Sequence, residues 1–515
     1  MARYKSYSYD QKTLIPIDFK EQVLPGTFEY ALNHLIDKEF DLSIFEDRYK
    51  NDETGAPAFD PAIMLKIILY AYSKGIIHSR KIERCCRENI IFKALSANTQ
   101  PHFTTIADFI SSIDKETVTL FRNALLICDE MGLIGKNMFA IDGCKLSSNA
   151  SKEWSGTRED FDKKKDKIEK TIKYIVEKHR SCDKQEGVFA GMKEEEEKSL
   201  EKLHSKAAKL KKWLEEHEDR KGKRGNIKKS NITDNESAKM PTSHGVIQGY
   251  NGVAAADFKH QVVVHAEAFG EGQESGLLEP MIKGVRDNFK EIGEKKDIYK
   301  KAAVLADSGF HSEENMKMLS EEKVDGYIAD GLFRKRDPRF ETAVRHKDGI
   351  NKKKKVYKAK YFTPKDFTYD ESAKKCTCPA GNDLWLKSTN LVKSTRSTGV
   401  SFMGRVKDCR ACELRSKCIR NPKTKARQVA FLNGVTKENQ KTFTQKMIKK
   451  IDSLKGRYLY SKRMGIVEPV FANICSTTGL NKFTLRGRKK INLQWKLYCI
   501  LHNIGKMYRY GPQMA

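Results

Sequence analysis

The sequence predicts a mixed α/β fold, in which a sheet core follows a helical N-terminal region and carries two insertions. Two short apolar runs, residues 138–142 and 302–306, have the length of buried strands, and they lead to Asp142 and Asp307. Between and after these runs, strand-like and helix-like patterns alternate, which is typical of an open α/β sheet. Such sheets place their sites at the carboxyl ends of strands, so both aspartates are candidate site residues.

Residues 1–135 are expected to form a helical domain that binds DNA or mediates dimerisation. Asp60 and Pro61 are expected to begin one helix, because Asp caps helices well and Pro suits their first position. Thr105 starts a Thr-x-x-Asp capping box that is predicted to begin another. Short helices with basic faces fit a helix-turn-helix unit, and an ordinary helical bundle explains them equally well.

Residues 136–330 are assigned to the first part of the core. Residues 158–220 are rich in Lys and Glu and carry apolar residues at helical spacing, which predicts an inserted helical hairpin. The other elements are expected in the order strand, strand, helix, strand, helix, strand, at residues 245–256, 260–268, 275–290, 302–306, 312–322 and 324–329.

Residues 331–455 break this pattern and form a basic, Cys-rich insertion, after which residues 456–515 are expected to complete the core with helices. Cys-x-x-Cys spacing with further cysteines nearby favours a structural, tetrahedral Zn²⁺ site. Five cysteines compete for four places, and Cys376 is taken as the spare or as a substitute for one of the others. The four favoured ligands are Cys378, Cys409, Cys412 and Cys418. Free thiols without metal are the alternative.

The charge balance predicts a polyanionic partner. The chain has 97 Lys+Arg against 68 Asp+Glu, a formal net charge of +29, which suits binding to nucleic-acid phosphates. No apolar run reaches the roughly 18 residues of a membrane span, and the first residues lack an apolar signal core. We therefore expect an intracellular protein without a membrane partner.

Three carboxylates stand in separate settings: Asp142, Asp307 and Glu468. Phosphodiester cleavage needs an activated nucleophile and a stabilised leaving oxygen, and two Mg²⁺ ions held by carboxylates roughly 4 Å apart supply both. The sequence signals no Ser–His or Cys–His pair and no Walker-type glycine loop. The competing interpretation is that each aspartate merely caps the element after its strand.

Four segments in fixed order carry a family resemblance: Ala-Ile-Asp-Gly-Cys-Lys at Asp142, Gln-Gly-Tyr-Asn-Gly-Val ending at residue 253, Leu-Ala-Asp-Ser-Gly-Phe at Asp307, and Tyr460-x-x-Arg463 leading to Val-Glu-Pro-Val-Phe at Glu468. With the helical N-terminus and the Cys-rich segment, they resemble an RNase H-like DDE transposase of a bacterial insertion sequence. The resemblance implies Asp142, Asp307 and Glu468 as catalytic ligands of Mg²⁺ or Mn²⁺.

The resemblance also implies partners and a reaction. It implies cleavage of double-stranded DNA at terminal inverted repeats, strand transfer into target DNA, a homodimer, and a cytoplasmic protein at the bacterial nucleoid. Two alternatives stay open. One is a decayed or domesticated descendant that binds DNA without cutting it, and the other is an RNase H-like nuclease without strand transfer.

The segment around Glu468 departs from the family pattern. The Lys expected seven residues after this Glu is Cys475, and Lys482 is a nearby substitute. Pro469 is expected to kink or restart the helix, because proline removes an N–H donor. Arg463 is a candidate clamp for phosphate or carboxylate, or a solvated charge, and Tyr460 a candidate DNA contact or packing residue.

Basic runs provide the remaining DNA-contact candidates, since phosphate contacts give affinity without sequence information. A run of this kind can also be an ordinary solvated face. The residues are Lys352, Lys353, Lys354, Lys355, Arg486 and Arg488. Tyr250 and Asn251 lie in a predicted strand, where hairpin packing is at least as good an explanation as a site role.

Overall fold

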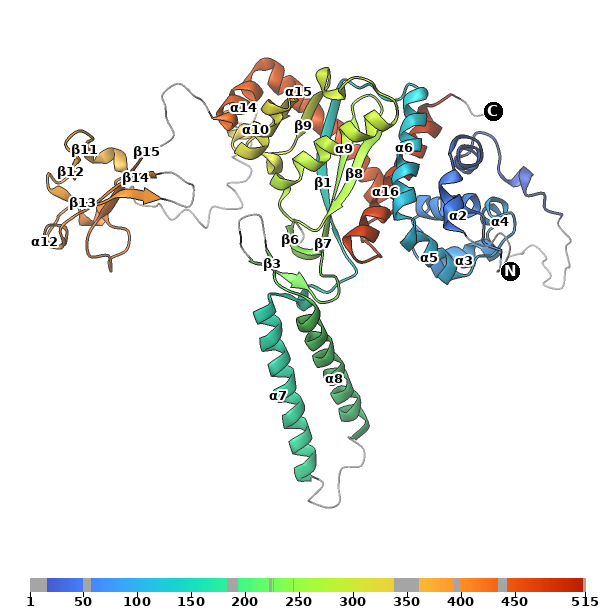
Figure 1. Ribbon diagram of the computed structural model, residues 1–515, viewed down its shortest axis with the longest axis horizontal. Coiled ribbons are helices and arrows are strands. Elements are labelled where there is room, and N and C mark those ends of the chain that lie inside the picture. Colours follow the sequence, from blue (N-terminus) through green and yellow to red (C-terminus); the bar gives the residue numbers. More distant parts are fainter. Residues whose placement is uncertain are drawn as a thin grey trace, which may run out of the picture. The chain divides into compact units, whose positions relative to one another are not determined.

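A computed structural model describes residues 16–49, 57–182, 193–221, 225, 227–243, 245–337, 361–392, 398–433 and 442–512. The chain divides into two compact units: residues 1–331 with 447–515, and residues 332–446. None of the described helices is both long and apolar enough to cross a membrane. The N-terminal helices, the sheet core and the helical arm belong to the first unit (Figure 1).

The core of the first unit is a mixed sheet with the order β8-β7-β1-β9-β10, and β6 pairs with the start of β7. Strand β1 runs antiparallel to β7 and parallel to β9, and β9 is parallel to β10. The strands are β1 (Met138–Ser147), β6 (Ala238–Thr242), β7 (Gly245–Asp257), β8 (Val263–Phe269), β9 (Ala303–Ala306) and β10 (Asp325–Ile328). This topology confirms the expected RNase H-like mixed α/β fold.

The predicted end of the first strand at Asp142 is wrong. Strand β1 continues to Ser147, because the long strand β7 pairs with it through Ser147↔Gly249. The parallel pairing with β9 is shorter and stops at Ile141↔Ala306. Asp142 is therefore the first residue of β1 without a neighbour on the β9 side, so one side of the strand is open there.

Helices cover both faces of this sheet. Because neighbouring residues of a strand point to opposite faces, Phe139 and Asp142 mark the two sides of β1. Phe139 packs against Phe289 of α9 (Leu278–Glu291), whereas Asp142 meets α15 (Leu454–Ala472). On the α15 side, the buried helix α16 (Arg488–Tyr510) packs along β8. The remaining core helices are α10 (Glu313–Glu321) and α14 (Phe443–Asp452).

Pro469 does not break α15, contrary to the expected kink or restart. The helix continues to Ala472 and passes into a single π-helical segment, Asn473–Thr477. Proline removes one backbone donor, while Arg463, Ile466, Val467 and Val470 keep a buried face against the core. Tertiary packing thus outweighs the loss of one hydrogen bond, and helical spacing holds from Arg463 to Glu468.

The N-terminal region is helical, as predicted. Its α-helices are α1 (Phe28–His34), α2 (Pro61–Ser73), α3 (Ser79–Glu88), α4 (Ile90–Leu95), α5 (Phe103–Ser112) and α6 (Asp114–Glu130). The Asp60 side chain caps α2 by accepting from the Ala62 N–H, as expected. The capping box at Thr105 is wrong: α5 begins at Phe103, with His102 as its cap.

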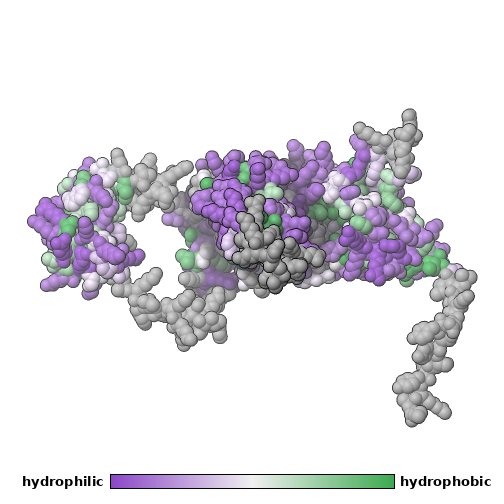
Figure 2. Space-filling model, turned by 90° about the horizontal axis from the view of Figure 1, so that it is seen from below, coloured by the Kyte–Doolittle hydropathy of each residue, from purple (hydrophilic) through white to green (hydrophobic). Residues whose placement is uncertain are grey.

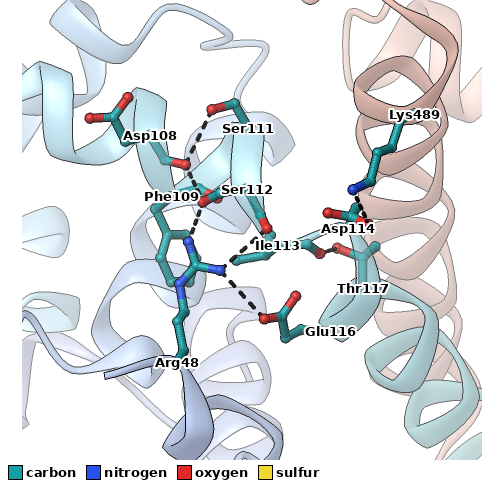
Figure 3. Close-up of polar contacts among 10 residues, drawn as sticks. All are labelled: Arg48, Asp108, Phe109, Ser111, Ser112, Ile113, Asp114, Glu116, Thr117 and Lys489. Carbon is teal, nitrogen blue, oxygen red and sulfur yellow. Dashed lines mark hydrogen bonds and ion pairs between the residues drawn. The ribbon is translucent and has the colours of Figure 1, made fainter. Parts of the chain in front are cut away.

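A polar junction joins these helices to the core (Figure 3). The Arg48 guanidinium donates to the Ser112 carbonyl at 3.2 Å and lies 3.4 Å from the Glu116 carboxylate. Next to it, Asp114 in the first turn of α6 pairs with Lys489 of α16 at 3.1 Å. Helix α16 therefore contacts both the sheet and the N-terminal domain within the first unit.

The predicted hairpin is present as an arm of two helices, α7 (Arg158–Cys182) and α8 (Lys193–Glu216) (Figure 1). Its apolar positions meet along the seam between the helices, where Phe161, Leu210 and Trp213 are buried. Short strands at its base are β2 (Ser155–Gly156), β3 (Arg220–Lys221), β4 (Ile227–Lys228) and β5 (Ser230–Asn231). The seam accounts for the helical periodicity of the sequence.

The second unit is a small antiparallel sheet with the order β11-β12-β13-β14-β15. Its strands are β11 (Thr368–Asp370), β12 (Lys375–Thr377), β13 (Asp383–Val392), β14 (Thr398–Met403) and β15 (Gln428–Asn433), and its short helices are α12 (Val406–Arg410) and α13 (Arg415–Cys418). The face of the molecule in Figure 2 is mostly hydrophilic, with scattered apolar residues, in keeping with a chain in which 32% of residues are charged.

Candidate active site

Arg463 brings the two aspartates together. Its Nη1 lies 2.6 Å from Asp142 Oδ2, and its Nη2 lies 3.6 Å from Asp307 Oδ1. Asp142 comes from the open stretch of β1, and Asp307 follows β9 directly. The strands therefore place both carboxylates at one end of the parallel pair, as predicted, and a single guanidinium bridges them.

The Arg463–Asp142 part of the bridge is largely buried, whereas the Asp307 side chain is 40% exposed. The side chain of Arg463 is 11% exposed and that of Asp142 is 22% exposed. Burial raises the pKa of Asp142 above its usual value, although Arg463 and the Gly143 N–H oppose that rise. Arg463 also lies over the ring of Tyr460, 5.8 Å from its centre. In this structure Arg463 clamps carboxylates, and Tyr460 packs beneath it.

Glu468 lies on the same helix but is not in contact with the aspartates. It follows Arg463 by five residues, which is about 140° around the helix and about 7.5 Å along it. Glu468 is exposed and makes no hydrogen bond or ion pair with another described residue. Throughout the described ranges, no three Asp, Glu, His or Cys side chains converge closely enough to hold a metal ion as they stand.

A contact between two cysteines shows that the chain just after Glu468 also packs against β1. Cys475 lies in the π-helical segment after α15, and its sulfur is 3.5 Å from that of Cys144. Cys144 is two residues after Asp142 and lies on the same face of β1. Along the chain, Glu468 therefore lies between two residues that contact this face of β1: Arg463 in α15 and Cys475 in the π-helical segment.

Sequence reasoning missed Glu274, which lies between β8 and α9. Its Oε1 accepts from Asn251 Nδ2 at 3.3 Å and is 4.0 Å from Lys145 Nζ. Burial raises the pKa of Glu274, and the nearby charges of Asp142 and Asp307 raise it further. The only sequence signal was its position in a Gly-rich link after a predicted strand. In the structure this link lies at the same end of the sheet as Asp142.

Two glycines next to the aspartates, Gly143 and Gly309, allow close packing around the site. Neither Gly143 nor Gly309 has a positive φ. A Cβ at Gly143 would contact the amide of Asn251, and one at Gly309 would collide with the carboxylate of Glu274. The glycines are required by close packing around the site.

Exposed basic side chains gather at the start of α16, beyond the end of β1. The backbone of Lys482 forms an isolated β-bridge with Ser147, the last residue of β1, and its side chain is exposed. Arg486 donates to the Asn149 carbonyl at 3.0 Å, and Arg488 pairs with Glu267 at 2.7 Å. A groove lined by Gly143, Lys145, Ser147, Glu274 and Asn481 leads from the carboxylates toward this region. Residues 352–355 lie outside the described residues.

In the second unit, four cysteines line one cavity. They are the favoured ligands Cys378, Cys409, Cys412 and Cys418. Cys376 is instead fully buried in the core of the small sheet, beside Phe402. Burial raises the pKa of the Cys418 thiol. As they stand, these thiols are not close enough to hold an ion, but thiol ligands suit a soft, tetrahedral ion such as Zn²⁺. Zinc occupancy therefore stays a prediction, with Cys376 outside the cavity.

Comparison with known families gives two matches. Residues 377–508 match the family described as "Transposase DDE domain", and residues 17–112 match "Transposase domain (DUF772)". No curated protein matches the chain. The chain is identified as a DDE-type insertion-sequence transposase. This agrees with the expected family, and the first match spans the cysteine cluster, Arg463 and Glu468.

Membership in this family carries general consequences. A transposase acts on DNA, and enzymes of the DDE type generally use divalent metals. The basic excess of the chain is consistent with a DNA partner. The family match itself identifies neither the ligand residues nor the individual reaction steps in this chain.

Proposed function

We propose that this transposase cleaves DNA at the ends of its insertion sequence and joins the freed 3′ end to target DNA, using divalent cations held by Asp142, Asp307 and Glu468. The observation that carries the proposal is the pairing of Asp142 and Asp307 with one buried guanidinium. Two carboxylates that hold a cation in the metal-free protein supply the hard oxygens that Mg²⁺ prefers.

The surroundings of the aspartates fit such an ion. Asn251 is fully buried, and no residue in the described part of the chain donates a hydrogen bond to its Oδ1. A buried acceptor without a donor is costly, and a nearby cation would remove that cost. When bound, the cations would lower the pKa of a nucleophilic water or 3′ hydroxyl and stabilise the charge on the leaving oxygen.

The protein's own residues would position the DNA and the cations. Asp142 is fixed by the long β1–β7 pairing, and Asp307 by the buried strand β9. Glu468 lies on the same helix as the guanidinium and is exposed, so its carboxylate would have to turn toward the aspartates to share a cation with them. The groove along Gly143, Lys145 and Asn481 offers a path for a phosphate backbone toward Lys482, Arg486 and Arg488.

The partner and assembly proposals follow from the same reaction. Terminal repeats and target DNA would bind as duplexes, with the N-terminal helices contributing to DNA binding or dimerisation. Two DNA ends must meet for transposition, so a homodimer is the expected active form. Arg463, which pairs with both carboxylates here, would also be placed to contact a DNA phosphate next to them.

The test is cleavage and joining of a labelled duplex that carries the flank of the encoding element, with Mg²⁺ or Mn²⁺. We expect metal-dependent cutting and joining by the wild type, loss of both in Asp307→Ala, and wild-type behaviour of Glu279→Gln, an exposed residue of α9. Binding without cutting by the wild type would favour the decayed DNA-binding descendant. Cutting without joining would favour the nuclease.

A further inference from the structure

We propose that Glu274 is a fourth acidic residue of the metal site and holds the divalent cation together with Asp142 and Asp307. The inference rests on the proposed function and names a ligand that neither the sequence motifs nor the family matches assign. It starts from position: β8 is parallel to β1, because both are antiparallel to β7. The link after β8 therefore emerges at the end of the sheet where Asp142 and Asp307 lie.

The carboxylate of Glu274 points toward the site and does not cap the helix that follows it. Helix α9 has Leu277 as its N-cap residue and no side-chain cap hydrogen bond. The Glu274 side chain instead packs against Gly309, two residues after Asp307, and is only 15% exposed. Glu274 thus reaches the end of the sheet from the α9 side, while Arg463 reaches it from the α15 side.

The carboxylates around Glu274 outnumber the cationic side chains that pair with them, so one more cation would be favourable there. The charges of Asp142 and Asp307 act on the Glu274 carboxylate. In the described part of the chain, Arg463 pairs with Asp142 and Asp307, and Lys145 lies opposite Glu274. The contact of Lys145 is long, at 4.0 Å. Burying carboxylates with incomplete compensation is unfavourable, and a divalent ion would reverse that imbalance.

A separate observation indicates where the ion would lie. Asn251 donates its Nδ2 hydrogen to Glu274, and its Oδ1 has no hydrogen-bond partner among the described residues although Asn251 is fully buried. A Cβ at Gly143, the residue after Asp142, would contact this oxygen. The unpaired oxygen is thus between the strand of Asp142 and the carboxylate of Glu274. It suits a hard-oxygen site, which a change of side-chain torsions would close around the ion.

The primary readout is Mn²⁺ binding by the full-length protein, measured by electron paramagnetic resonance without DNA. Glu274→Gln keeps the shape of the side chain and removes its charge. We expect the dissociation constant to rise about 10-fold or more, which is the scale of losing a partner in a metal site. Glu279→Gln is the matched control on the next helix and should bind Mn²⁺ like the wild type. Asp142→Asn should lose binding at this site.

The outcomes separate this inference from the proposed function. Wild-type Mn²⁺ affinity in Glu274→Gln, with loss in Asp142→Asn, would overturn the role of Glu274 alone. Wild-type affinity in both variants would overturn the metal site itself. A purely structural role predicts that Glu274→Gln lowers the melting temperature of the metal-free protein. Our account predicts an equal or higher value, because like-charge repulsion is removed. Glu274→Asp, which retains the charge but shortens the reach, should also bind Mn²⁺ more weakly.

Discussion

Replacing Arg463 with glutamine should destabilise the metal-free protein and make it more responsive to metal. The change leaves Asp142 and Asp307 without the cation that now bridges them. Removing one partner of a buried ion pair costs about 3–5 kcal/mol. Because the Asp142 side chain is still 22% exposed, we expect a loss near the lower limit, about 3 kcal/mol, in the free energy of unfolding.

A divalent cation should offset most of this loss. A ligand present at about 100 times its dissociation constant stabilises the folded state by about 2.7 kcal/mol. Because the competing guanidinium is gone, Arg463→Gln should also bind Mn²⁺ more tightly than the wild type. Urea unfolding followed by circular dichroism, with and without Mn²⁺, measures both effects.

Two further variants test the reasoning. Arg84→Gln breaks an ion pair with Glu88 whose side chains are 70% and 60% exposed, and should leave the free energy of unfolding nearly unchanged. Adding Asp142→Asn to Arg463→Gln should cost less than the sum of the single changes, because the unpaired charge is removed. A loss below about 1 kcal/mol in Arg463→Gln, the range of an exposed pair, or no recovery with Mn²⁺, would refute the bridging role.

Three other predictions concern separate parts of the chain. Burial lowers the pKa of His502 to about 4. The free energy of unfolding should therefore be highest above the unfolded pKa near 6.5 and fall by up to about 3 kcal/mol as the pH drops toward 4. His502→Gln should flatten this pH dependence, measured by urea unfolding. Cys409→Ser should abolish bound zinc measured by mass spectrometry, whereas Cys376→Ser should retain it. Diamide should join Cys144 to Cys475, and the resulting disulfide should slow DNA cleavage until dithiothreitol is added.

Each of these has a control and a contradicting result. His204→Gln, on the exposed surface of α8, should leave the pH dependence unchanged; an equally steep acid loss in His502→Gln would exclude His502 as its source. Zinc loss in Cys376→Ser with retention in Cys409→Ser would reverse the ligand assignment. A cysteine-to-serine change at position 475 should prevent the cross-link, and unaltered cleavage by the oxidised wild type would show that this contact does not affect the site.

Much of the order of elements could be predicted from sequence because strands such as β9 and β10 are short apolar runs next to a turn, whereas β6 was not predicted. Strand β9 and helix α10 begin within one residue of their expected positions. The end of β1 could not be predicted, since Lys145 to Ser147 are in the strand only because β7 pairs with them. Likewise, the continuity of α15 through Pro469 depends on packing against the sheet.

In the candidate site, too, residues marked by a local sequence pattern could be predicted, and residues placed only by strand pairing could not. Asp142 and Asp307 could be found because a local pattern, an apolar run followed by a carboxylate, marks each. Glu274 has no such pattern: it reaches the site only because β8 ends at the same sheet edge. The bridging role of Arg463 was open for the same reason, since a lone basic residue on a helix does not reveal which carboxylates face it.

The most direct test of the account is to locate the metal itself. Fe²⁺ in place of Mg²⁺, with ascorbate and peroxide, cuts the backbone next to the bound ion, and mass spectrometry maps the cuts. We expect cuts near Asp142, Asp307 and Glu468 that disappear in Asp142→Asn and are suppressed by excess Mg²⁺. Cuts confined to residues 378–418, or cuts unaffected by Asp142→Asn, would contradict it.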